Sequence, residues 1–115
     1  MPLIRMETSA PIPTENRDDL ALALSRIAAD AIGKPESYVM AVVTEAAVTM
    51  AGKTGPAAFL QVCSIGKINQ TVNRDITTRV ADLLQERLGI SAERIYISFN
   101  DVQAVNWGWN RTTFG

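Results

Sequence analysis

The sequence predicts an α+β fold in which two β-α-β units form one four-stranded sheet with both helices on one face. The first observation behind this is that the second half of the chain repeats the first at an offset of 56 positions, so that Leu3 matches Phe59 and Gly33 matches Gly89. The second is that each half has two apolar, β-rich runs, one before and one after a helical pattern. Such units have parallel strands and right-handed crossovers, which bring the two helices to the same face.

The first half of the chain contains a strand, a helix and a second strand. Residues 2–8 alternate as a strand does, and residues 9–15, with two prolines, form a loop. Asn16 is a candidate N-cap, and apolar residues then recur at helical spacing until Gly33 ends the helix. Residues 38–44 are apolar on both sides, which predicts a central strand.

The second half repeats this order without a gap. Asp19 matches Asp75 and Val39 matches Ile95, while residues 52–56 form a turn by composition. Because both helices cover one face, the other sheet face would stay in water. A soluble monomer rarely exposes so much contiguous apolar area, so we expect another subunit to cover that face.

Composition limits the function classes that remain. With 115 residues and 47% hydrophobic content we expect one domain over residues 1–115. The net charge of -1 and the absence of a basic block argue against nucleic-acid and membrane partners. No histidine is present and Cys63 is the one cysteine, which excludes histidine triads, histidine zinc sites and internal disulfides. Residues 5–13 do not fit a signal peptide and no apolar run is long enough to span a membrane, so we expect a cytoplasmic location, with secretion by another route left open.

The N-terminal segment carries the first candidate catalytic group. A small residue at position 2 lets Met1 be removed, which would leave Pro2 with a free secondary amine. Apolar neighbours such as Leu3 disfavour the protonated form of an amine, so Pro2 is a candidate base near neutral pH. The alternative is that a Met-Pro start signifies only efficient methionine removal.

Three further features each allow two interpretations. Lys34 either complements the C-terminal end of the first helix or binds a ligand. Residues 63–67 are either a glycine turn with a solvated lysine or a strand end whose backbone N–H groups bind an anion. Trp107, Trp109 and Phe114 either line a pocket or pack between subunits.

These same positions resemble a known family. The resemblance covers the whole chain and rests on six motifs in order: Met1-Pro2-Leu3-Ile4, Gly33-Lys34-Pro35, Ser64 to Ile68, Glu86 to Ser91, Arg94 to Ile97, and Gly108-Trp109-Asn110. Together they are similar to the macrophage migration inhibitory factor family of the tautomerase superfamily. The resemblance implies a homotrimer whose three sheets form a barrel with the helices outside, and whose sites lie at subunit interfaces.

The resemblance also implies an activity. It is the keto-enol tautomerisation of phenylpyruvate-like α-keto acids, an isomerase reaction in which Pro2 is the general base and acid, with no metal or other cofactor. Lys34 and the backbone N–H of Ile65 would hold the substrate carboxylate. The other implied substrate-binding residues are Ser64, Tyr38, Ser98, Trp107, Trp109, Phe114, and Tyr96 of a neighbouring subunit.

The sequence departs from the family pattern at several positions. Ser98 replaces the asparagine of the animal cytokine, and Trp107 fills a place usually held by a smaller residue, so a preference for hydroxylated rings is not implied. Ala57 and Leu60 replace its two Cys-Ala-Leu-Cys cysteines, so we expect no thiol-disulfide activity. The alternative function is a trimeric, cytokine-like binding or signalling protein with a vestigial pocket.

Overall fold

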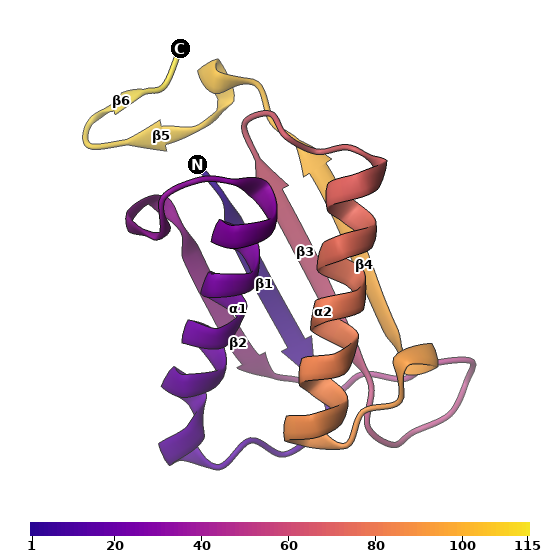
Figure 1. The fold of residues 1–115 in the computed structure, drawn as a ribbon. Helices are drawn as coiled ribbons and strands as arrows, with labels where there is room; N and C mark the ends of the chain where they lie inside the picture. The colour runs from indigo at the N-terminus through magenta and orange to yellow at the C-terminus, as the bar shows by residue number, and fades with distance from the viewer.

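The computed structural model describes residues 1–115 and has a mixed four-stranded sheet with two long helices on one face (Figure 1). The elements are β1 (Leu3–Thr8), η1 (Thr14–Asn16), α1 (Arg17–Ile32), η2 (Glu36–Tyr38), β2 (Met40–Glu45), β3 (Ala58–Ser64), α2 (Gln70–Leu88), η3 (Ala92–Arg94), β4 (Ile95–Asp101), η4 (Ala104–Asn106), β5 (Gly108–Trp109) and β6 (Thr112–Thr113). The order in the large sheet is β2-β1-β3-β4. Strands β1 and β2 are parallel, as are β3 and β4, while β1 and β3 are antiparallel. The predicted fold class is confirmed.

The internal repeat extends to the short elements that join helix and strand. Helix α1 ends at Gly33, with φ 76°, and α2 ends at Gly89, with φ 66°. Both glycines adopt the left-handed C-cap conformation that other residues rarely take. The short helices η2 and η3 then follow at matching positions before β2 and β4. Asn16 occupies the N-cap position of α1 as predicted, but its side chain makes no capping hydrogen bond.

The prediction that the second strand is central was wrong. Strand β2 is an edge strand, and β1 lies between it and β3. Ala41 and Val43 pack against the core, whereas Met40 on the opposite side is 64% exposed. A strand that is apolar on both sides needs cover on both sides, and within one chain β2 has cover only from the helices.

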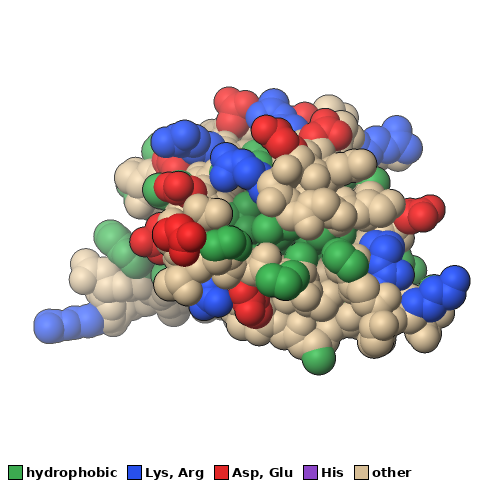
Figure 2. Space-filling view, turned by 90° about the horizontal axis from the view of Figure 1, so that it is seen from below, with side chains coloured by type: hydrophobic (Ala, Val, Ile, Leu, Met, Phe, Trp, Pro, Cys, Tyr) green, Lys and Arg blue, Asp and Glu red, His purple; other side chains and the backbone are tan.

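The core lies between the sheet and the two helices. Along β1 and β3 the side chains alternate between buried and half-buried, as a sheet covered on one face requires. The fully buried residues with the largest side chains include Ile4, Met6, Leu24, Leu60, Ile76, Leu84 and Ile90. Neither helix is both long enough and apolar enough to cross a lipid bilayer. Figure 2 shows this apolar layer from below, surrounded by side chains of both charges.

The uncovered sheet face is partly polar, which the apolar runs in the sequence did not indicate. The Arg5 guanidinium donates to Gln61 Oε1 from Nε at 3.3 Å and from Nη2 at 3.0 Å. Its Nη1 lies 3.1 Å from Glu7 Oε1. Phe59 and Cys63, which alternate with Gln61 along β3, give this face an apolar component as well.

Truncating Leu60 tests the importance of the core. Leu60 is fully buried, so Leu60→Ala should lower the free energy of unfolding by about 2 to 5 kcal/mol through lost burial and a new cavity. Leu22 on α1 is 51% exposed, and Leu22→Ala should change the free energy of unfolding by less than about 0.5 kcal/mol. Denaturant unfolding measures both, and equal losses would contradict this description of the core.

Candidate active site

A cavity of about 730 Å³ lies at the N-terminal end of β1. Three segments form it: the start of the chain, the connection from η2 into β2, and the C-terminal segment around β5, which lies beside the N-terminus in Figure 1. Its lining residues are Met1, Pro2, Leu3, Ser37, Tyr38, Val39, Met40, Trp107, Gly108, Trp109 and Phe114. Five residues predicted from the sequence therefore meet at one cavity: Pro2, Tyr38, Trp107, Trp109 and Phe114.

Pro2 is held firmly at the start of β1. Its side chain is fully buried, and its carbonyl accepts a hydrogen bond of 3.0 Å from the Met40 N–H. Leu3, the next residue, pairs with Met40 on one side and with Cys63 on the other. Proline suits this position because it has no N–H for the ladder. The strand pairing fixes Pro2 between the start of β2 and the end of β3.

The α-amine at this end of β1 has a lowered pKa. In the structure Met1 precedes Pro2, and burial is the main cause that lowers the pKa of the Met1 amine, with the positive charge of Lys34 acting in the same direction. Both causes disfavour the protonated amine. While Met1 is attached, the Pro2 nitrogen belongs to a tertiary amide and has no basicity.

The aromatic wall of the cavity is built on a short hairpin that the sequence analysis missed. Strands β5 and β6 pair across a turn in which Asn110 and Arg111 have φ 49° and 71°. Positive φ at both central residues fits a tight hairpin, and Asn110 was the signal that could have revealed it. The rings of Trp109 and Phe114 stack with centroids 5.7 Å apart and planes 10° apart. The Phe114 N–H donates to the Trp107 carbonyl at 3.1 Å, which closes the hairpin.

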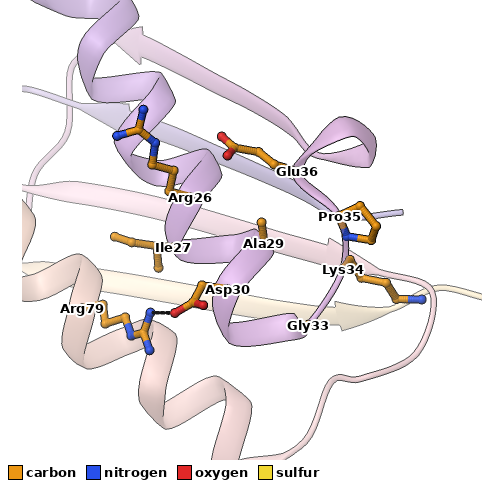
Figure 3. Close-up of a pocket in the computed structure, with 9 residues that line it drawn as sticks. All are labelled: Arg26, Ile27, Ala29, Asp30, Gly33, Lys34, Pro35, Glu36 and Arg79. Atoms are coloured by element: carbon orange, nitrogen blue, oxygen red, sulfur yellow. Dashed lines mark hydrogen bonds and ion pairs between the residues drawn. The ribbon is translucent and has the colours of Figure 1, made fainter.

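Lys34 lines a second hollow of about 720 Å³ on the helical side and is not among the residues that line the aromatic cavity. The second hollow also contains Arg26, Glu36 and the Asp30–Arg79 ion pair that joins α1 to α2. Figure 3 shows the Lys34 ammonium directed away from these side chains. Its positive charge nevertheless contributes to lowering the pKa of the Met1 amine, and Met1 lines the aromatic cavity. Because α1 has no basic residue in its last turn, Lys34 also suits the helix end, and the two interpretations are compatible.

The backbone N–H groups of the loop after β3 are not all free to bind an anion. The Gly66 N–H donates to Asp101 Oδ1 at 3.0 Å, so it is already occupied. Ser64 is fully buried and its Oγ has no hydrogen-bond partner. The Ile65 N–H donates to no acceptor within the chain. Neither Ser64 nor Ile65 lines the cavity, although the loop begins beside the N-terminal end of β1.

Tyr96 and Ser98 do not reach the cavity of their own chain. Both lie on β4, which is separated from β2 by two strands, and Tyr96 is 66% exposed. Conversely, sequence reasoning missed the contributions of Leu3, Ser37, Val39 and Met40 to the cavity wall. Their proximity in sequence to Pro2 and Tyr38 was the available signal.

The chain is similar in sequence and in fold to several known proteins. The sequence profile described as Macrophage migration inhibitory factor (MIF) matches residues 1–115. The macrophage migration inhibitory factor of Meriones unguiculatus is 37% identical over 115 residues, with 99% of each chain covered. The crystal structure of the homologue from Prochlorococcus marinus has a TM-score of 0.92 at 38% identity, covering 98% of this chain and 99% of that one. The macrophage migration inhibitory factor-like protein of Entamoeba histolytica has a TM-score of 0.92 at 30% identity, covering 98% of each chain. The chain therefore belongs to the macrophage migration inhibitory factor family.

Proposed function

We propose that the protein is a keto-enol tautomerase of phenylpyruvate-like α-keto acids, with Pro2 as its general base and acid once Met1 has been removed. The family includes both tautomerase-type and cytokine-like proteins. The observation that carries the proposal is that Pro2 borders the aromatic cavity at a place where burial and Lys34 lower the pKa of an amine. A lowered pKa is what a base that works near neutral pH requires.

The proposed reaction moves one proton within the substrate. The neutral Pro2 amine takes a proton from the carbon next to the keto group. The electrons of that C–H bond form the C=C bond of the enolate, and the negative charge moves to the keto oxygen. The protonated Pro2 then returns the proton to that oxygen, so that the enol leaves and the neutral amine is restored.

The surroundings of the amine set its protonation state. Once Met1 is removed, the terminal amine is that of Pro2, one residue further along the chain. We expect the two effects that lower the pKa of the Met1 amine, burial first and the charge of Lys34 second, to act on it as well. Since the lowered pKa leaves a larger neutral fraction at a given pH, kcat/KM should stay high until the pH falls through that pKa.

Substrate binding divides between charge and apolar contact. The Lys34 ammonium would attract the carboxylate of the keto acid, and the Ile65 N–H, which has no partner in the chain, would donate a hydrogen bond to it. Tyr38, Trp109 and Phe114 would surround the aryl ring. This division fits a substrate with one carboxylate and one apolar ring.

We also propose that the protein works as a homotrimer with shared sites. Tyr96 and Ser98 lie at the sheet edge opposite the cavity, and one sheet face lacks cover. Association through the sheets would cover that face and bring Tyr96 of one copy to the cavity of another. The cytoplasmic location expected from the sequence remains a prediction.

The alternative function, cytokine-like binding with a vestigial pocket, makes no use of a basic amine. The aromatic cavity, the desolvated amine and Lys34 together favour the enzyme, because a protein that only binds a receptor needs none of the three. Activity that depends on methionine removal distinguishes the two functions.

Methionine removal should therefore switch the activity on. A preparation without Met1, verified by mass, should tautomerise phenylpyruvate about 10² to 10⁴ times faster than one that retains it, because an amide nitrogen cannot act as the base. Ultraviolet absorbance of the enol follows the reaction. Equal rates in the two preparations would rule Pro2 out as the base.

The shared site can be tested by light scattering and by mixing subunits. Static light scattering should give the mass of three chains. Pro2→Leu, which lacks the secondary amine and retains Met1, and Tyr96→Ala should each be weakly active alone. After joint unfolding and refolding, mixed trimers contain interfaces with an intact Pro2 and an intact Tyr96, so activity should rise above that of either variant. A stable monomer, or no gain on mixing, would contradict the shared site.

A further inference from the structure

We propose that Asp101 is a positioning residue that holds the loop after β3 so that the Ile65 N–H can donate a hydrogen bond to the substrate carboxylate. The proposal rests on the proposed function and adds a residue to it. Asp101 lies at the end of β4, is exposed, and touches neither the cavity nor Pro2. Its role is argued from the loop it holds.

The loop has a backbone that needs an external anchor. Gly66 has φ 78° and Lys67 has φ 65°, so two consecutive residues adopt the left-handed region. Glycine accepts this conformation readily, but a lysine with its Cβ does not. A turn of this kind persists only when the surrounding contacts fix it.

Strand β4 supplies these contacts on both sides of Ile65. Before Ile65, the Ser64 carbonyl accepts a hydrogen bond of 2.8 Å from the Val102 N–H. After Ile65, the Gly66 N–H donates to Asp101 Oδ1 at 3.0 Å. Ser64 and Asp101 are also paired in the β3–β4 ladder. The two peptide groups that flank Ile65 are therefore fixed by adjacent residues of β4, and only the second bond depends on a side chain.

Strand register indicates where the Ile65 N–H points. The Pro2 carbonyl accepts from Met40 of β2, so the N–H and carbonyl of the next residue, Leu3, face β3. Leu3 pairs with Cys63 in that antiparallel ladder. Continued by two residues, the same register places Ile65 level with Met1. Removal of Met1 would leave the Ile65 N–H directed at the space beside the Pro2 amine.

Asp101 acts through the position of its hydrogen-bond acceptor, which is separate from its negative charge. A carboxylate would repel the carboxylate of a keto acid, so its negative charge offers binding no advantage. As an acceptor at a fixed distance, however, it fixes the Gly66 peptide and with it the Ile65 N–H. An asparagine would provide a similar acceptor without the charge, and a glutamate would provide the charge with its acceptor displaced by one methylene group.

Three variants of the processed protein separate these effects. Asp101→Ala and Asp101→Glu should each raise KM for phenylpyruvate by about tenfold, the cost of one hydrogen bond to a charged group. Asp101→Asn should keep KM within about twofold of the wild type. In all three, kcat and the acid limb of the pH profile of kcat/KM should not change, because Pro2 and Lys34 are intact. Asp82→Ala, at an exposed position of α2, is the matched control and should behave as the wild type.

Two results would overturn the role of Asp101. An unchanged KM in Asp101→Glu and Asp101→Ala would show that the loop does not need the anchor. A loss in Asp101→Asn equal to that in Asp101→Ala would assign the effect to charge. If Asp101→Ala does not fold, the contrast between the asparagine and glutamate variants still decides between geometry and charge.

Binding of phenylacetate separates failure of this inference from failure of the proposed function. Phenylacetate has the ring and the carboxylate but no keto group, so it binds without turnover. It should shift the Ile65 amide resonance of the wild type and of Asp101→Asn, and bind about tenfold more weakly to Asp101→Glu. An active wild type whose Ile65 amide does not respond would overturn the inference alone. A wild type with neither activity nor a response would overturn both.

Discussion

The burial of an α-amine at the start of a paired strand is the constraint on which the candidate site depends. Strand β1 lies between β2 and β3, so the residues at its N-terminal end have neighbours on both sides. The Met40–Pro2 hydrogen bond fixes the backbone there, and the aromatic cavity borders the same end of the strand. A free chain end would be solvated and would keep its ordinary pKa. Here burial lowers the pKa, and the charge of Lys34 lowers it further.

The same β-α-β repeat builds the fold and distributes the functional groups. In the first unit, α1 ends at Gly33, and the charge of the next residue, Lys34, contributes to lowering the pKa of the amine that precedes β1. In the second unit, the matching strand β3 ends at the loop that carries the free Ile65 N–H. Since β1 and β3 are antiparallel, the start of one lies beside the end of the other. The duplication therefore brings a candidate base and a candidate carboxylate site together without any long functional loop.

Much of the fold could be predicted because the repeat fixes it twice. A glycine stop after each helix, with matched strands on either side, was visible in the sequence and is present in the structure. The order of the strands was harder, since the apolar residues of β2 suggested a central strand although it lies at the edge. Hydrophobic pattern reports whether a strand has cover, but not whether its own chain supplies that cover.

The candidate site was predicted in part for similar physical reasons. Pro2, Trp107 and Trp109 are conspicuous by residue type, and the structure places them at one cavity. The hairpin β5–β6 was missed because its strands have only two residues each, too few to show a periodic pattern. The Asp101–Gly66 hydrogen bond joins residues 35 positions apart, and only the β3–β4 register brings them together.

The most direct test of this account is the pKa of the Pro2 amine in the protein without Met1. Nitrogen-15 NMR of labelled proline can follow its titration, and the pH dependence of kcat/KM for phenylpyruvate can be recorded on the same sample. The account predicts a pKa below the ordinary range of an α-amine, equal to the midpoint at which kcat/KM falls as the pH is lowered, and a rise in both values in Lys34→Gln. An ordinary or raised pKa of the Pro2 amine, or an acid limb that does not follow it, would contradict the central claim.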